Sequence, residues 1–113
     1  MKDENILVIE KYLDSLRRQD LSDAPLADDV RFENPVAGKG VGAESMKAWL
    51  SGYLSAFHEV RVLHHVADGE YVVTHWESDS PFGTIQVLEK FRVREGLIVE
   101  AIAFLDPRPV FGN

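Results

Sequence analysis

The sequence of 113 residues contains no cysteine. It can therefore form no disulfide, thiolate nucleophile or cysteine-based zinc site. It also lacks an apolar run of roughly 18 residues, the length that a membrane-spanning helix needs. The first residues, Met1 to Asn5, are polar and acidic, unlike the basic start and apolar core of a secretory signal. From these absences we expect a cytoplasmic protein.

Positive charge is scarce: twelve Lys and Arg stand against nineteen Asp and Glu, which gives a formal net charge of -7. Such a chain is poorly suited to bind nucleic-acid phosphates or an anionic membrane. Its length and its 45% content of hydrophobic residues are typical of one globular domain, and we expect that domain to span 1-113. Small molecules or other proteins are the expected partners.

Two segments carry the spacing of amphipathic helices. In Ile6 to Leu16, apolar residues recur every three or four positions, and Tyr12 borders that stripe. Tyr12 is either a packing residue or a hydroxyl available to a polar partner. A second helix is predicted from Glu44 to Phe57, with Trp49 at the margin of its apolar face.

The segment Val30 to Pro35 alternates like a short strand that ends at proline. Asn34 shares a face with Val30 and Phe32, so its amide must find hydrogen-bond partners or carry a desolvation cost of roughly 1 to 3 kcal/mol. Asp28 and Asp29 are predicted to form a solvated turn before this strand. The glycine-rich segment from Ala37 to Ala43 meets neither the dinucleotide nor the P-loop pattern, so we interpret it as a connector.

The rest of the chain reads as four strands joined by turns. Asp68-Gly69 is a strong hairpin signal, so the two strands on either side of it should pair antiparallel. The predicted strands are Glu59 to Val66, Tyr71 to Ser78, Thr84 to Arg94 and Leu97 to Leu105.

Glu89 falls on the buried face of its strand with Val87 and Phe91. A carboxyl group there must be paired, hydrogen-bonded or protonated, and burial would raise its pKa. It is either an acid in a pocket or a structural carboxylate held by a buried partner; a third possibility is that strand twist exposes it.

The last strand, Leu97 to Leu105, is apolar on both faces except at Glu100, and Ile98, Ile102 and Phe104 are predicted to share one of them. A strand of this kind is covered on both sides. The helices of the domain would cover one side. A second copy of the chain could cover the other, which predicts a homodimer.

Three short motifs resemble a known family: Tyr12-Leu13-Asp14-Ser15-Leu16, Ala27-Asp28-Asp29-Val30 followed by Glu33-Asn34-Pro35-Val36, and Glu89-Lys90-Phe91-Arg92. They look most like the ketosteroid isomerase branch of the nuclear transport factor 2-like superfamily and its SnoaL-like polyketide cyclase relatives. The resemblance implies an α+β fold, in which a cone-shaped, curved, mostly antiparallel sheet packs with three N-terminal helices. One of these helices would lie within Asp20 to Ala27.

The resemblance also implies a site. Tyr12 and Glu89 would donate hydrogen bonds to the oxygen of an enolate, and Asn34 occupies the position of the family's catalytic base. An amide cannot accept the proton, so another group must supply that function. His75 and Glu77 share one face of their strand and could do so, although Thr74 and Trp76 could equally be the inward pair.

Two other chemistries are not expected. Limonene epoxide hydrolases, which the chain resembles more weakly, use an Asp, Arg, Asp cluster, whereas the corresponding strands here carry His75-Trp76-Glu77 and Ala101-Ile102-Ala103. Of the four histidines, His64 and His65 are adjacent on a strand and point to opposite faces, and no metal-ligand spacing is present. We therefore expect neither a metal nor another cofactor.

Two functions stay open. The first is an isomerase or cyclase that acts on a cyclic or polyketide-like ketone through an enolate, with Tyr12, Glu89 and His75 as the candidate catalytic residues. The second is a ligand-binding or dimerisation module without catalysis. In both, a hydrophobic small molecule would contact Asn34, Trp49, Phe57, Trp76, Phe91 and Ala103.

Overall fold

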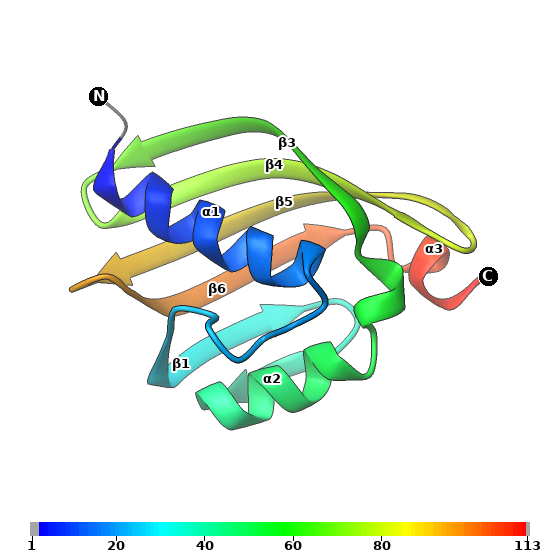
Figure 1. Cartoon of the computed structure of the whole chain (residues 1–113), viewed down its shortest axis with the longest axis horizontal. Coiled ribbons are helices and arrows are strands. Elements are labelled where there is room, and N and C mark those ends of the chain that lie inside the picture. The colour runs from blue at the N-terminus through cyan, green and yellow to red at the C-terminus, as the bar shows by residue number, and fades with distance from the viewer. Residues whose placement is uncertain (1–2, 113) are drawn as a thin grey trace.

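The computed structural model describes residues 3-112 (Figure 1). Helix α1 is followed by six strands, with two short helices between β2 and β3 and another after β6. In chain order, the elements are α1 (Glu4–Arg17), β1 (Leu26–Asn34), β2 (Gly38–Val41), α2 (Ala43–Ser51), the 3-10 helix η1 (Leu54–Ala56), β3 (His58–Asp68), β4 (Tyr71–Ser80), β5 (Gly83–Arg94), β6 (Leu97–Leu105) and α3 (Arg108–Phe111).

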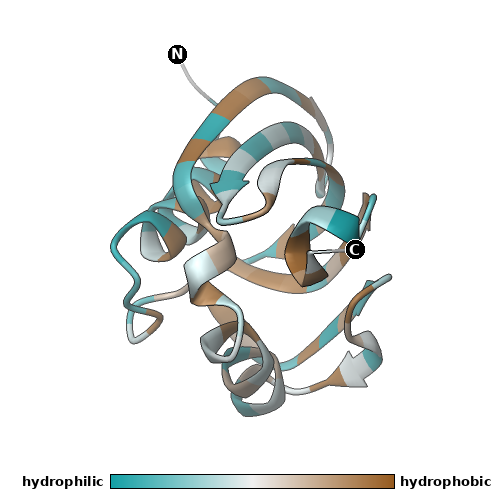
Figure 2. Ribbon diagram, turned by 90° about the vertical axis from the view of Figure 1, so that its right-hand side faces the viewer, coloured by the Kyte–Doolittle hydropathy of each residue, from teal (hydrophilic) through white to brown (hydrophobic). Residues whose placement is uncertain are grey.

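All six strands form one sheet in the order β2-β1-β6-β5-β4-β3. Only β1 and β6 run parallel, and the other neighbours are antiparallel. The sheet is curved, and α1 and α2 lie on the same side of it (Figures 1 and 2). These observations confirm the expected α+β class with a mostly antiparallel sheet.

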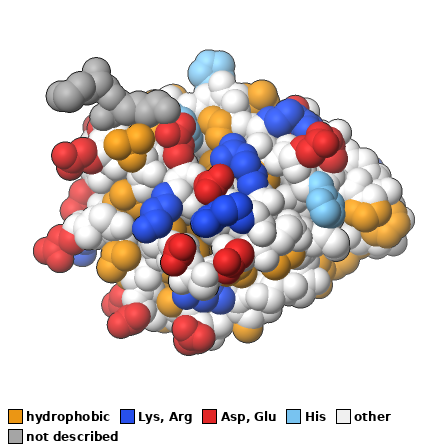
Figure 3. Space-filling view, viewed as in Figure 1, with side chains coloured by type: hydrophobic (Ala, Val, Ile, Leu, Met, Phe, Trp, Pro, Cys, Tyr) orange, Lys and Arg blue, Asp and Glu red, His pale blue; other side chains and the backbone are white. Residues whose placement is uncertain are grey.

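Helix α1 forms where the sequence predicted it. Asp3 caps its N-terminus, because Oδ1 accepts hydrogen bonds from the backbone N–H groups of Asn5 at 2.8 Å and Ile6 at 3.4 Å. The apolar stripe of the helix faces the sheet, and Ile9 and Leu13 are fully buried there. On the side of the molecule seen in Figure 3, charged side chains are interspersed with hydrophobic ones.

The helix expected within Asp20 to Ala27 is absent. The side chain of Asp20 instead accepts hydrogen bonds from the backbone N–H of Ser22 at 3.0 Å and from its hydroxyl at 2.8 Å, and β1 begins at Leu26. Such local side-chain bonds compete with helix formation, and Pro25 disfavours helical backbone at the residue before it. The third α-helix of the described chain is α3, which follows the sheet.

Strand β2 lies within the segment that the sequence suggested was a connector. It pairs antiparallel with the end of β1. Its Gly40 lies under the ring of Phe32, and a Cβ atom at that position would overlap the ring. Asp28 and Asp29 are exposed as expected, but they lie inside β1 rather than in a turn.

The second predicted helix is shorter than expected. Helix α2 ends at Ser51, and η1 forms a separate turn after Gly52 and Tyr53. No helix within residues 3-112 is long and apolar enough to cross a membrane.

The hairpin at Asp68-Gly69 is confirmed, since Asp68 and Tyr71 are paired across it. Its register decides which residues of β4 face the helices. Val72, Thr74 and Trp76 are buried on the inner face. His75 and Glu77 therefore lie on the outer face.

Candidate functional site

A cavity lies between the inner face of the sheet, α1, α2 and α3. Its volume is about 40 Å³, roughly three times the space that one water molecule needs. Most of the lining is apolar. The side chains that carry a polar atom are Tyr12, Asn34, Trp49, Tyr53, Trp76 and Glu89.

Three of the lining residues form a row across the sheet. Glu89 on β5 is paired with Ala103 on β6. Asn34 follows Glu33, which is paired with Ile102, so Asn34 lies beside Ala103 on the other side. Because neighbouring strands are about 4.8 Å apart, the backbones at Asn34 and Glu89 are separated by about 10 Å. The small side chain of Ala103 leaves the floor between them open.

Glu89 is a buried carboxyl group with 5% of its surface exposed. The indole Nε1 of Trp76 donates a hydrogen bond to its Oε1 at 3.1 Å. Burial raises the pKa of Glu89 to about 7, and the hydrogen bond from Trp76 offsets part of that rise. The group therefore exchanges its proton near neutral pH, as an acid–base catalyst must.

Tyr12 reaches the same cavity from α1. Its ring meets that of Phe91 edge to face, with centroids 5.7 Å apart and planes at 68°. Burial, and then the nearby charge of Glu89, hold the pKa of Tyr12 well above its ordinary value of 10. Tyr12 consequently keeps its proton near pH 7, and its hydroxyl can donate a hydrogen bond to a ligand oxygen.

Asn34 faces the cavity, as the alternation in its strand predicted, and is 8% exposed. Its Oδ1 accepts hydrogen bonds from the backbone N–H groups of Val36 at 3.0 Å and Ala37 at 2.7 Å. These bonds fix the turn between β1 and β2. Within residues 3-112, Nδ2 makes no hydrogen bond. The amide thus has its acceptor occupied and its donor available.

Aromatic side chains surround the polar groups. The Trp49 ring lies 6.4 Å from that of Phe32 and 6.0 Å from that of Tyr53. The Trp76 ring lies 6.0 Å from that of Phe57. The Nε1 atom of Trp49 is buried and finds no hydrogen-bond partner in the described part of the chain.

Two expected site residues lie elsewhere. His75 is on the outer face of the sheet, where its Nε2 is 3.1 Å from Oε1 of Gln86, so it does not reach the cavity. Phe91 is fully buried against Tyr12 and lies outside the cavity lining. The expected positions of Tyr12, Asn34, Trp49, Phe57, Trp76, Glu89 and Ala103 in the lining agree with the structure.

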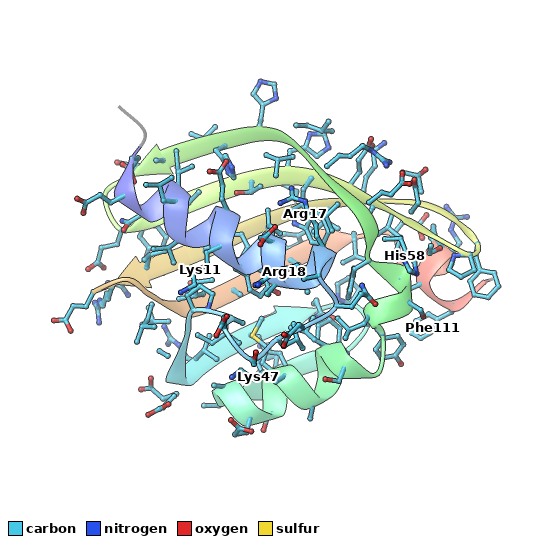
Figure 4. The ribbon with its side chains drawn as sticks, viewed as in Figure 1. Lys11, Arg17, Arg18, Lys47, His58 and Phe111 are labelled. Atoms are coloured by element: carbon cyan, nitrogen blue, oxygen red, sulfur yellow. The ribbon has the colours of Figure 1, made fainter. Side chains whose placement is uncertain are left out.

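The sequence did not indicate that the C-terminal segment belongs to the site. Val110 of α3 lines the cavity. The ring of Phe111, labelled in Figure 4, meets that of Tyr53 edge to face at 6.2 Å. Helix α3 therefore closes one end of the cavity. Figure 4 labels four cations that lie outside the lining: Lys11 and Arg17 on α1, Arg18 directly after it, and Lys47 on α2.

The lining contains one carboxyl group, Glu89, and no arginine among residues 3-112. It therefore does not reproduce the Asp, Arg, Asp cluster of limonene epoxide hydrolases. What it offers is one proton-transfer group, the hydroxyl of Tyr12 and the amide donor of Asn34 in an apolar enclosure. Such a set of groups suits chemistry at a carbonyl oxygen and the carbon next to it.

Solved structures resemble this fold along nearly the whole chain. An NTF2-like protein of unknown function from Cytophaga hutchinsonii superposes with a TM-score of 0.84 at 18% identity, over 98% of this chain and 97% of that one. A steroid delta-isomerase from Pseudomonas aeruginosa has a TM-score of 0.77 at 21% identity, over 98% and 86%. An LEH-like epoxide hydrolase from M. tuberculosis also has a TM-score of 0.77, at 26% identity over 96% and 87%.

These similarities establish the nuclear transport factor 2-like fold, whose members include isomerases, hydrolases and cyclases. The search of curated proteins gave no match. The model of the SnoaL-like domain matches residues 9-101, which is most of the chain. The chain therefore belongs to the SnoaL-like domain family.

Proposed function

We propose that the cavity binds a cyclic or polyketide-like ketone and that Glu89 moves a proton at the carbon next to its carbonyl group. The observation that carries this proposal is the buried carboxyl group of Glu89, whose pKa is about 7, in the same cavity as the hydroxyl of Tyr12. The reaction would be an isomerisation or an aldol-type cyclisation through an enolate.

The reaction needs one group that accepts the proton from carbon and one group that donates a hydrogen bond to the carbonyl oxygen. The Glu89 carboxylate takes the proton from the carbon, the C–H electron pair forms a C=C bond, and the carbonyl π electrons move to oxygen. Tyr12 donates a hydrogen bond to that oxygen and keeps its own proton. In a ketone with a C=C bond next to the α-carbon, return of the proton from Glu89 to the far end of the conjugated system gives the isomer. In a ketone with a second carbonyl group, attack of the enolate carbon forms a C–C bond and an alkoxide, and the alkoxide takes the proton from Glu89 to give the cyclised alcohol.

We assign Glu89 as the proton acceptor because the other candidate residues either are not basic or lie outside the cavity. Asn34 has an amide, which has no useful basicity. His75 and Glu77 lie on the outer face of the sheet, where Glu77 pairs with Arg61 at 2.9 Å. This assignment gives Glu89 the role of base, rather than the role of hydrogen-bond donor that the family resemblance implied.

Hydrogen–deuterium exchange tests the proposal. Cyclopentanone, a small cyclic ketone, would be incubated with the protein in D₂O, and the loss of its α-proton signal would be followed by NMR. Glu89→Gln should lower the protein-dependent rate by about a hundredfold or more, the usual contribution of a general base. Tyr12→Phe should lower it less, since the base is retained.

Glu33→Gln is the matched control, because Glu33 is a strand carboxylate whose only ion pair, among residues 3-112, is with Lys39 at 3.8 Å on the opposite face. The Glu33→Gln protein should exchange the α-protons of cyclopentanone at the same rate as the parent protein. An exchange rate that is the same in the parent and in Glu89→Gln would remove Glu89 from the proton transfer.

A non-catalytic binding module is the second candidate, and the small cavity favours it. A volume of about 40 Å³ leaves little room for a substrate to reorient, and the family's base position holds Asn34. In that case ketones would raise the melting temperature of the protein without accelerating proton exchange. The same two measurements therefore separate the two functions.

We also propose that a second copy of the chain covers the outer face of the sheet. Val66 of β3, Leu88 of β5 and Phe104 of β6 are exposed there, and Phe104 is 63% exposed. Leu88 and Phe104 are directly paired across their strands, so they form a continuous apolar surface. Burial of such side chains in a symmetric contact would supply the favourable term for association.

A further inference from the structure

The cavity has a second polar side that proton transfer by Glu89 does not use. Asn34 stands at the end of β1, and Trp49 of α2 stacks on Phe32, two residues earlier on the same face of that strand. Tyr12 and Glu89 come instead from α1 and β5. Residues with polar side chains therefore line the cavity from different sides, with Ala103 between Asn34 and Glu89.

Two donors on the second side make no hydrogen bond within residues 3-112. The Nε1 atom of Trp49 is fully buried and has no partner there. The Nδ2 atom of Asn34 also has no partner there, but it is not among the fully buried atoms. A buried donor left without a partner carries the full desolvation cost of its N–H group. An acceptor oxygen brought by a ligand would remove that cost.

We propose that Asn34 and Trp49 form a second subsite, which binds a neutral acceptor oxygen of a ligand whose reacting carbonyl lies at Tyr12 and Glu89. This inference rests on the proposed binding of a carbonyl compound in the cavity. It makes Asn34 a specificity-determining residue instead of a lost base.

The chemistry of the site favours a neutral oxygen. Both donors are uncharged, and the lining residues within 3-112 include no Lys or Arg to balance a carboxylate. A second negative charge beside Glu89 would also have to be desolvated in an apolar cavity. An ester, ketone or amide carbonyl meets the donors without either cost.

The spacing of the row limits the ligand. The backbones at Asn34 and Glu89 are about 10 Å apart, from two strand spacings. A ligand that meets both sides must therefore carry its two oxygens on one chain that extends across Ala103.

A matched pair of probes tests the subsite. Methyl acetoacetate has a ketone and an ester carbonyl, and 2-hexanone keeps the ketone but replaces the ester by methylene groups. NMR titration of the ¹⁵N-labelled protein would follow the two indole N–H signals, which belong to Trp49 and Trp76, with Trp49→Phe providing the assignment. The ester should bind about fivefold more tightly, as one added hydrogen bond predicts, and it should shift the Trp49 signal.

Two variants remove a donor and keep the local structure. Asn34→Asp retains the oxygen that accepts from Val36 and Ala37, and Trp49→Phe retains the aromatic ring against Phe32. Each should reduce the fivefold preference to near unity, with binding of 2-hexanone retained in Trp49→Phe. Asn5→Asp makes the same chemical change on α1, at a side chain that donates to Gly69 O outside the cavity, and should keep the preference.

The outcomes distinguish this inference from the proposed function. Equal affinity for the two probes, or a preference that survives in both variants, overturns the subsite while leaving proton transfer by Glu89 intact. Preference for the ester together with unchanged exchange in Glu89→Gln leaves the subsite standing and removes the catalytic role. If neither probe binds, the subsite is overturned, and the deuterium exchange of cyclopentanone decides the proposed function separately.

Discussion

Trp76 on β4 donates its indole N–H to the carboxyl group of Glu89 on β5 across 3.1 Å, and both side chains are buried on the inner face of the sheet. A hydrogen bond to the ionised carboxylate stabilises the charged form, so it counteracts the effect of burial on the pKa. The pKa of Glu89 is therefore set by its burial on β5 and by the hydrogen bond from Trp76 on the neighbouring strand β4.

Trp76→Phe should raise the pKa of Glu89 further. The substitution keeps an aromatic ring near Phe57 but removes the donor, and the loss of a hydrogen bond to a charged group predicts a shift of about one unit. A ¹³C NMR titration of the glutamate side-chain carboxyl signals would measure it. Trp49→Phe is the control, since Trp49 donates no hydrogen bond to Glu89. An unchanged or lowered pKa in Trp76→Phe would contradict the prediction.

Glu89→Gln should stabilise the protein at high pH. The carboxyl group has a pKa of about 7 in the folded protein and an ordinary value of 4.5, so the folded state holds the proton more tightly. The parent protein consequently loses stability as the pH rises from about 4.5 through 7, whereas the glutamine side chain of the variant does not titrate. The difference between the two should grow by up to about 3 kcal/mol over that range.

Urea unfolding at pH 4.5 and pH 8 would measure this change. The comparison is a difference between two proteins, so the ion pairs of the surface, such as that of Glu70 with Arg92, contribute equally to both. A stability difference that is the same at the two pH values would show that Glu89 does not titrate with a raised pKa.

Ala103→Leu should fill the space between Asn34 and Glu89. The larger side chain would abolish binding of ketone probes, and overpacking would lower the free energy of unfolding by about 1 to 3 kcal/mol. Thermal-shift titration with cyclopentanone would measure the binding and urea unfolding the stability. Ala67→Leu, at an exposed position on β3, should change neither by much. Retained binding in a folded Ala103→Leu protein would place the ligand elsewhere.

Phe104→Glu should dissociate the proposed homodimer. A charge at the centre of an apolar contact must be desolvated without a partner, which opposes association. Light scattering after size-exclusion chromatography should give a dimer mass for the parent at micromolar concentration and a monomer mass for the variant. Phe82→Glu, at a phenylalanine that is 61% exposed in the turn before β5, should remain dimeric. A monomeric parent protein would exclude the dimer.

Local sequence patterns were enough to predict the elements that depend on residues close together in the chain. The stripe through Ile9 and Leu13 predicted α1, and Asp68-Gly69 predicted the β3–β4 hairpin. Alternation also placed Asn34 and Glu89 on the inner face, because the side chains of a strand point to opposite sides in turn. The sequence therefore predicted that Asn34 and Glu89 share the inner face of the sheet.

Other features depended on contacts between distant segments. A bulge in the pairing of β5 with β6 makes Arg92 the partner of Glu100 and Val93 the partner of Ile98. The extra residue reverses the alternation along β6, so Ile98 is buried whereas Phe104, expected on the same face, is exposed. Strand β2 was missed for a related reason, since a glycine-rich segment becomes a strand only when Phe32 and β1 lie beside it.

The sequence by itself determined that this protein is a small acidic domain of helices and strands with a carboxyl group on the apolar face of one strand, because composition and side-chain period are local properties. The tertiary structure alone decided that Thr74 and Trp76, rather than His75 and Glu77, face inward, because β4 carries mixed residues on both sides. Strand register chose between them, by setting Trp76 beside Val87 and Thr74 beside Glu89. The same register gave Glu89 its hydrogen-bond donor and left His75 outside the cavity.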